Sequence, residues 1–168
     1  LVGLPSSGFH SNGYSLIRKV IKNENLKWDS PNPINKNSLI KEELLIPTKI
    51  YQKILSPLVS NKIISGLSHI TGGGITENLP RILPKNLSFK INLDKWEMPR
   101  LMSWIIKKSE MSEAEALKTF NCGIGMICVV SKNNIQTLID YFKNKNEDFY
   151  LIGEITNTKS HSYMGNLF

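Results

Sequence analysis

The sequence has little cysteine, little arginine and no long apolar run. It holds two cysteines, Cys122 and Cys128, and neither a CxxC pair nor a Cys/His cluster that would indicate a structural zinc site. Both thiols lie in one apolar stretch, so we expect them on one side of a strand, as small core residues of a cytoplasmic protein. No stretch approaches the ~18 apolar residues of a membrane span.

Arginine is scarce although the chain is basic. The formal net charge is +7, and among 21 basic residues only Arg18, Arg81 and Arg100 are arginine. The lysines are spread along the chain. Bidentate recognition of bases or phosphates favours arginine, so this scatter argues against a nucleic-acid-binding surface.

The beginning of the sequence lacks an initiator methionine, a charged leader and a long apolar segment. It reads Leu1-Val2-Gly3-Leu4-Pro5, which is not a signal peptide. We therefore expect the chain to be part of a longer polypeptide. Its 168 residues, 40 % of them hydrophobic, fit a single domain over residues 1–168.

Apolar spacing predicts strands alternating with helices. Strands are expected at residues 1–4, 63–70, 87–93, 123–130 and 149–155. Helical spacing is expected at residues 13–21, 39–45, 50–59 with an interruption near Pro57, 75–83, 101–108 and 134–143. Ser112 and Glu115 form a capping-box pattern for one further helix. The tail from Asn157 is polar and is expected to fray. This order predicts an α+β fold, a layered domain whose mixed sheet is covered by helices.

The first glycine-bearing turn precedes the helix predicted from residue 13. A helix N-terminus offers unpaired N–H groups and the positive end of a dipole, and glycine lets an anion approach the backbone. Under this interpretation the turn binds phosphate through Ser6, Ser7, Gly8, His10, Ser11, Asn12 and Gly13. The alternative interpretation is structural: Ser11 or Asn12 caps the helix, and Gly8 makes a turn.

The second glycine-bearing turn follows the strand predicted at residues 63–70. Thr71, Gly72, Gly73 and Gly74 form a flexible segment that a regular element would not favour, but that suits close backbone contact with a ligand or another chain. His69 is better explained as a satisfied histidine at a strand end, and Glu77 as a dipole-favoured or capping carboxylate in the first turn of a helix than as a general base.

No catalytic arrangement is visible in the sequence. Neither GxxxxGK[ST] nor GxGxxG is present, and there is no GxSxG elbow, HExxH motif or carboxylate pair with catalytic spacing. The residues alone therefore support an anion-binding α+β domain, with no catalytic residue and no metal ligand assigned.

Six segments together resemble one enzyme family, the AIR synthetases (phosphoribosylformylglycinamidine cyclo-ligases). They are GLPSSGFHSNGYSL at 3–16, ELLIPTKIY at 43–51, GLSHITGGG at 66–74, ENLPRILP at 77–84, TFNCGIGM at 119–126 and GEI at 153–155. They follow the order of the family and span nearly the whole chain. Lys49 and Lys118 stand where the family pattern favours arginine, which puts any bidentate contact there in doubt.

The resemblance implies the carboxy-terminal half of an enzyme that uses ATP and Mg²⁺. Such an enzyme closes formylglycinamidine ribonucleotide to aminoimidazole ribonucleotide in purine biosynthesis. It implies a homodimer with its site in a cleft between two domains, the metal ligands lying in the amino-terminal domain. Residues 6–13 and 71–74 would then hold phosphate groups of the substrate or of ATP.

Related enzymes of the same superfamily are the first alternative. These are thiamine-phosphate kinases, selenophosphate synthetases and the formylglycinamidine ribonucleotide amidotransferase, and the loop from His10 to Tyr14 favours the cyclo-ligase over them. A non-catalytic anion- or RNA-binding module is the second alternative. A steep salt dependence of RNA binding would favour that module.

Overall fold

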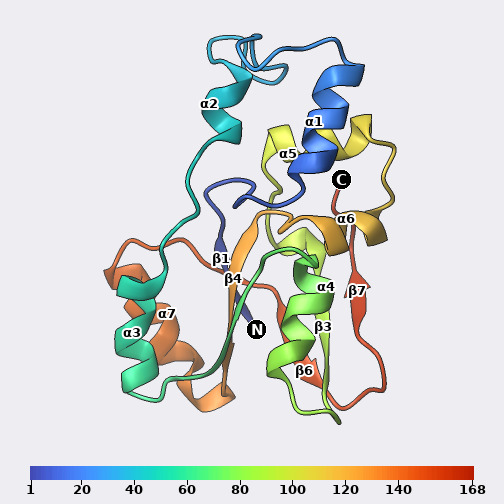
Figure 1. Cartoon of the computed structure of the whole chain (residues 1–168). Coiled ribbons are helices and arrows are strands. Elements are labelled where there is room, and N and C mark those ends of the chain that lie inside the picture. The colour runs from blue at the N-terminus through green and yellow to red at the C-terminus, as the bar shows by residue number, and fades with distance from the viewer.

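The computed structural model describes all residues, 1–168, and contains two sheets (Figure 1). The larger sheet is antiparallel throughout, in the order β2 (Ile64–His69), β4 (Ile124–Val130), β1 (Val2–Pro5) and β5 (Tyr150–Leu151). The smaller sheet has the order β6 (Gly153–Thr156), β3 (Ser88–Asn92) and β7 (Ser162–Met164). Only the smaller sheet is mixed, because β3 pairs antiparallel with β6 and parallel with β7.

Helices cover these sheets in groups. Figure 1 shows α1, α2 and α5 at the upper end, α6 at mid-height above α4, α3 with α7 at the lower left, and α4 beside the smaller sheet. Their bounds are α1 Tyr14–Asn23, α2 Ile40–Leu44, α3 Gln52–Ser60, α4 Gly74–Asn78, α5 Arg100–Lys108, α6 Glu113–Thr119 and α7 Ile135–Asn144. Short 3-10 turns lie at Leu79–Ile82, Leu93–Lys95 and Lys132–Asn134. The predicted α+β class is confirmed, with two sheets where one mixed sheet was expected.

Two hydrophobic cores lie on opposite faces of the larger sheet. Val2 and Leu4 of β1 pack with Leu55 and Leu58 of α3 in a core of nine buried residues. The other face belongs to a core of 25 buried residues that includes Ile127 of β4 and side chains of α1, α5 and α6. Alternate side chains of a strand point to opposite faces, so β4 contributes to both cores.

The strand predicted at residues 149–155 breaks at Ile152, where the chain passes from one sheet to the other. The Ile152 N–H donates to the Leu1 carbonyl at 3.1 Å, and its carbonyl accepts from Asn92 N–H at 2.8 Å. Ile152 is completely buried. The segment predicted as one strand therefore connects the two sheets, with Ile152 hydrogen-bonded to Leu1 before β1 and to Asn92 of β3.

The expectation of a frayed tail is wrong for its last part. Strand β7 pairs with β3, and His161 stacks on Phe89 with ring centres 5.0 Å apart. The Tyr163 hydroxyl is 2.9 Å from Thr76 Oγ1, and burial raises the pKa of Tyr163 to about 12. The tail is ordered because a partner strand and an aromatic surface, both distant in sequence, receive it.

Three local expectations need correction. Pro57 lies inside α3 without interrupting it. The helix predicted at residues 75–83 is α4 followed by a 3-10 turn that begins beside Pro80, which lacks an N–H. Cys122 precedes β4 with a left-handed φ of 51° and lies in the larger core, whereas Cys128 lies in the smaller one. The two thiols therefore do not share a face.

Candidate functional site

The loop between β1 and α1 is held in place by Asn121, which is completely buried. Asn121 Nδ2 donates to the Gly8 carbonyl at 2.8 Å, while its Oδ1 accepts from Gly123 N–H at 2.8 Å and from Ser6 Oγ at 3.2 Å. The Ser7 hydroxyl donates to the Pro47 carbonyl at 2.7 Å. The hydroxyl groups of Ser6 and Ser7 thus donate to Asn121 and Pro47, and the Gly8 carbonyl accepts from Asn121.

His10 connects this loop to the segment before α3. Its Nε2 accepts from the backbone N–H of Ser7 at 3.0 Å and from that of Lys49 at 3.3 Å. The side chain is 5 % exposed. Burial, followed by the nearby His69 and Lys49, lowers the pKa of His10 to about 4, so the imidazole is neutral at physiological pH. His10 therefore does not supply the positive charge that a phosphate site was expected to gain from it.

Two donors of the loop are buried without a partner in the chain, His10 Nδ1 and Asn12 Nδ2. Buried polar atoms in folded proteins are nearly always hydrogen-bonded, so such atoms call for an explanation. Both belong to residues that the sequence singled out for ligand binding. Ser11 between them is exposed and has a left-handed φ of 61°.

Helix α1 begins at this loop without a side-chain cap. The N-cap residue is Gly13 in the left-handed conformation, with φ 72°, so the capping interpretation of Ser11 and Asn12 is wrong. A Cβ at Gly13 would overlap the Phe120 ring, with Cζ at 2.8 Å. Close packing on Phe120 thus explains this glycine, and the first-turn N–H groups of α1 are left for a ligand or solvent.

The triple-glycine turn between β2 and α4 is shaped by left-handed backbone and by Asn78. Gly73 and Gly74 have φ of 98° and 56°. A Cβ at Gly74 would overlap the Leu117 carbonyl, so α6 packs directly against the turn. Asn78 Nδ2 reaches the carbonyls of Thr71, Gly72 and Gly74 at 3.3, 3.2 and 2.8 Å. These carbonyls therefore face Asn78, and Gly72 is the exposed residue of the turn.

The structure brings the two turns together. A Cβ at Gly72 would lie 3.9 Å from Asn12 Oδ1, and the ring centres of His10 and His69 are 6.3 Å apart. His69 ends β2 as predicted, but it is exposed and makes no side-chain hydrogen bond, so it is not the satisfied histidine expected there. Glu77 lies in the first turn of α4, 4.0 Å from the Arg81 guanidinium.

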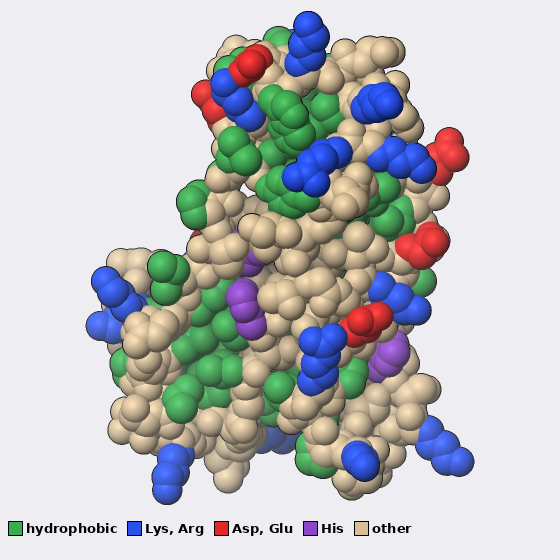
Figure 2. All heavy atoms as spheres, viewed as in Figure 1, with side chains coloured by type: hydrophobic (Ala, Val, Ile, Leu, Met, Phe, Trp, Pro, Cys, Tyr) green, Lys and Arg blue, Asp and Glu red, His purple; other side chains and the backbone are tan.

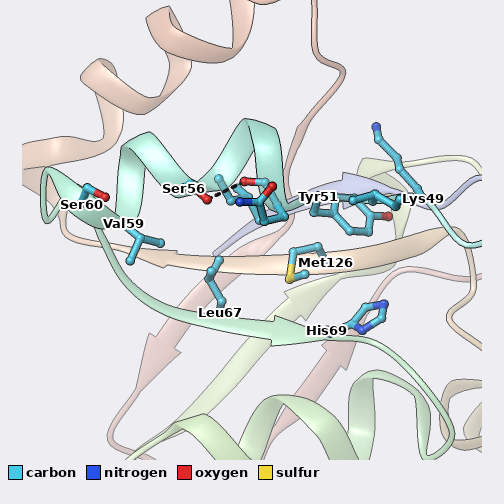
Figure 3. Close-up of a pocket in the computed structure, with 11 residues that line it drawn as sticks. Lys49, Tyr51, Ser56, Val59, Ser60, Leu67, His69 and Met126 are labelled. Carbon is cyan, nitrogen blue, oxygen red and sulfur yellow. Dashed lines mark hydrogen bonds between the residues drawn. The ribbon is translucent and has the colours of Figure 1, made fainter.

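A pocket of about 500 Å³ opens next to this junction, between α3 and the strands β2 and β4. Figure 3 shows Tyr51, Met126 and His69 pointing toward one another at one end, with Lys49 beyond Tyr51. The Tyr51 hydroxyl donates to the Pro5 carbonyl at 2.7 Å, and Lys49 pairs with Glu147. Figure 2 shows apolar side chains gathered over this part of the molecule, at the lower left of the view. Ile50, on its rim, is 80 % exposed.

Sequence reasoning missed the residues that shape the site without touching its centre. These are Asn121, Tyr51, Asn78 and Gly125. At Gly125 a Cβ would overlap the Tyr51 hydroxyl and lie 2.6 Å from His10 Cε1. A sequence signal for such residues is a polar residue or glycine next to apolar strand positions, as in the stretch from Asn121 to Gly125.

Acidic residues do not gather at the site. No group of three or more histidine, cysteine, aspartate or glutamate side chains in the chain is placed to hold a metal ion. The Mg²⁺ implied by the resemblance thus finds no ligand set here. None of the helices combines the length and the hydrophobicity of a membrane-spanning segment.

Solved structures share this fold at low sequence identity. The chain aligns with Stenotrophomonas maltophilia thiamine-monophosphate kinase with a TM-score of 0.60 and 11 % identity, covering 99 % of this chain and 50 % of that one. Escherichia coli HypE, a hydrogenase maturation protein, gives a TM-score of 0.58 and 15 % identity, covering 98 % and 46 %. These likenesses define the fold class: the chain folds like one domain of such proteins.

Sequence similarity then gives the family. Residues 1–165 match the family described as AIR synthase related protein, C-terminal domain, and the chain belongs to it. It is 43 % identical over 159 residues to the bifunctional purine biosynthetic protein PUR2,5 of Pichia angusta, covering 95 % of this chain and 20 % of that protein. It is 39 % identical over 155 residues to ADE5,7 of Saccharomyces cerevisiae, also described as bifunctional and purine biosynthetic, covering 92 % and 19 %. The chain thus spans about a fifth of the length of these relatives.

Proposed function

We propose that the chain is the carboxy-terminal half of a phosphoribosylformylglycinamidine cyclo-ligase, a purine-biosynthesis enzyme that uses ATP to close formylglycinamidine ribonucleotide to aminoimidazole ribonucleotide. Family membership and the purine-biosynthetic relatives support this assignment. The role proposed for the chain itself is to bind phosphate groups of the substrate or of ATP at the junction of the loops 6–13 and 71–74.

The observation that supports this role best is the surplus of hydrogen-bond donors at the junction. His10 Nδ1 and Asn12 Nδ2 are buried and unpaired, and α1 begins beside them without a side-chain cap. Phosphate oxygens are strong acceptors, and a helix N-terminus favours negative charge. Gly72 on the facing turn leaves room for a ligand to approach the backbone, because the nearest atom to a Cβ there would be 3.9 Å away.

In the proposed reaction these residues bind and orient, and proton transfer is assigned to none of them. The reaction needs the formamide oxygen activated by phosphorylation and an internal amine held close to the same carbon. Holding the phosphates fixed supplies such positioning. Because the donor set here is neutral, the charge of ATP must be balanced by groups outside this chain.

Mg²⁺ and the remaining site residues are therefore assigned to an amino-terminal domain. The apolar surface around Ile50, Leu67 and Met126 is where we expect that domain to pack, because it adjoins the junction and is rich in apolar side chains. A homodimer in the cytoplasm completes the proposal, and two buried free thiols are compatible with that reducing compartment.

Titration with inorganic phosphate tests the proposed site. At constant ionic strength, backbone amide NMR signals of Gly8, Ser11, Asn12 and Gly13 should shift together, followed by those of residues 72–74. Gly8→Val should abolish these shifts because a β-branched residue disfavours the φ of 152° at this position, while the nearest atoms leave space at 3.8 Å. Lys132→Ala, at an exposed position on the 3-10 turn before α7, is the control and should change nothing.

The same titration separates the alternatives. Shifts spread over scattered surface lysines, with the loop unaffected, would contradict the phosphate site. RNA binding that weakens steeply with salt and leaves the loop signals unchanged would favour a non-catalytic module. A related superfamily enzyme would be indicated if the intact protein bound thiamine phosphate or selenide-derived substrates in place of formylglycinamidine ribonucleotide.

A further inference from the structure

The two ring nitrogens of His10 have different surroundings, which fix the position of its proton. Nε2 accepts hydrogen bonds from the backbone N–H groups of Ser7 and Lys49 at 3.0 and 3.3 Å. A backbone N–H can only donate, so Nε2 presents its lone pair and the neutral ring carries its proton on Nδ1. The Ser7 hydroxyl, 3.0 Å from Nε2, already donates to the Pro47 carbonyl. Nδ1–H is therefore a donor whose acceptor is missing from the chain.

The space around Nδ1 is fixed on two sides and adjustable on the third. Gly125 contributes no side chain, and a Cβ there would lie 3.0 Å from Nδ1. Tyr51, with its ring centre 6.2 Å from that of His10, is fixed by its hydrogen bond to Pro5. His69, 6.3 Å away, is exposed and makes no side-chain hydrogen bond. The His69 ring can therefore turn without breaking a hydrogen bond, unlike the ring of Tyr51.

We infer that His10 contacts the ligand directly, donating its Nδ1–H to a ligand oxygen that enters as the His69 ring moves aside. The inference rests on the proposed function for the identity of the ligand. The bond supplies the acceptor that this buried donor lacks. With the proton on Nδ1, that atom cannot act as a general base or as a metal ligand, so His10 serves recognition and orientation.

The same geometry makes the contact independent of pH over the physiological range. The groups facing His10 are His69 from β2, Lys49 from the segment before α3 and Tyr51 at the start of α3. Protonating Nε2 would break two hydrogen bonds from backbone N–H groups. Burial first, and then His69 and Lys49, also lower the pKa of His10 to about 4. The donor should thus be present in one form from pH 6 to 8.

Nitrogen-15 NMR of histidine-labelled chain tests the proton position directly. Nε2 of His10 should give the signal of an unprotonated ring nitrogen and Nδ1 that of a protonated one, unchanged from pH 6 to 8. Inorganic phosphate at constant ionic strength should then shift the Nδ1–H signal of His10. A proton on Nε2, or an Nδ1–H signal that does not move while the loop amides do, would overturn the inference. If no loop amide moves either, the proposed phosphate site itself has failed.

Two substitutions test the donor at Nδ1 and the acceptor at Nε2 one at a time. The Gln side chain of His10→Gln places an oxygen near the position of Nε2, so it retains the acceptor for Ser7 and Lys49 but loses the donor at Nδ1. We expect a folded chain with about tenfold weaker phosphate binding, the effect of losing one hydrogen bond to a charged oxygen. His10→Asn keeps a donor near Nδ1 and loses the acceptor, so the Ser7 and Lys49 amide signals should move while much of the binding remains.

The matched control is His161→Gln. His161 directly precedes β7 and stacks on Phe89, away from the loop 6–13 in sequence. Its replacement should therefore leave phosphate binding unchanged. Phosphate binding by His10→Gln as tight as that of the unchanged chain would show that the donor has no ligand role. Equal losses in the Gln and Asn variants would show that His10 acts only by holding the loop.

Discussion

Gly125 is a residue whose importance comes from the atoms packed over it. A Cβ there would overlap the Tyr51 hydroxyl and lie 2.6 Å from His10 Cε1. Tyr51 is held by Pro5 and His10 by two backbone N–H groups, so neither ring moves without losing hydrogen bonds. A single methyl group at residue 125 would therefore displace Tyr51, which lines the pocket, and His10, which connects the loop to the segment before α3.

The corresponding prediction is that Gly125→Ala destabilises the chain by about 1–3 kcal/mol, the usual effect of overpacking a filled interior. Urea unfolding measures it. Gly72→Ala is the control because the nearest atom to its Cβ would be 3.9 Å away, and it should cost much less. Equal stability of the Gly125→Ala variant and the unchanged chain would mean that the packing over residue 125 is loose.

His10 makes stability depend on pH. Its pKa is lowered to about 4, through burial first and then His69 and Lys49, whereas an unfolded histidine has a pKa of about 6.5. Between these values the unfolded chain binds a proton that the folded chain does not, so stability should fall as pH drops from 6.5 through 4. The loss from this residue is at most about 3 kcal/mol.

Urea unfolding of the chain and of His10→Gln, across pH 4 to 7, isolates this contribution from that of the carboxyl groups. The Gln variant should show a flatter profile in this window. A profile that runs parallel to that of the unchanged chain would contradict the low pKa of His10.

At this scale the sequence singled out the two residues with unpaired buried donors, but not the residues that support them. His10 and Asn12 were singled out by their place before a helix, and the structure puts an unpaired donor on each. Asn121 was not, because its partners Ser6 and Gly8 are 115 and 113 residues away in the chain. Such a role depends on tertiary contacts that no local spacing encodes.

Elements with a strong local pattern were predicted closely. The alternation around Phe89 and Ile91 became β3, and Ser112 with Glu115 forms the capping box of α6. The break at Ile152 and the strand β7 were not predicted, because each depends on a partner strand distant in sequence. Pro57 was expected to interrupt α3, yet tertiary packing of Leu55 and Leu58 keeps that helix whole.

The prediction at the scale of elements concerns β7. Removing residues 157–168 takes away the parallel partner of β3 and uncovers Phe89, which is 1 % exposed in the structure. The cost should be about 2–4 kcal/mol, from exposure of one large aromatic side chain and loss of its neighbours. Urea unfolding and amide exchange in β3 measure it.

Removal of Phe168 alone is the control for this truncation. Phe168 is 46 % exposed and lies outside the paired strand, so its loss should have little effect. If the longer truncation left stability and the exchange of β3 amides unchanged, β7 would not be docked in solution.

The whole molecule presents one side of a proposed cleft. Fold class and family followed from the sequence because its motifs are numerous and in order, and the family match covers residues 1–165. The division into two sheets and two cores did not follow, since it arises from how strands distant in sequence pair.

The prediction at this scale is that the isolated 168-residue chain shows no cyclo-ligase turnover. Its donor set is neutral and it has no cluster of carboxylates for Mg²⁺. Incubation with formylglycinamidine ribonucleotide, ATP and Mg²⁺, followed by assay of aminoimidazole ribonucleotide, tests this. Turnover comparable to that of an intact relative would show that the chain holds a complete active site.

The separation of the two thiols gives each core its own chemical reporter. Burial raises the pKa of both, that of Cys128 to about 12, so neither reacts until its surroundings open. Alkylation followed by mass spectrometry therefore times the opening of each face of the central sheet. Cys128 should be modified first, because its core has nine buried residues against 25 around Cys122. Equal rates would instead mean that both faces of the sheet open in one cooperative event.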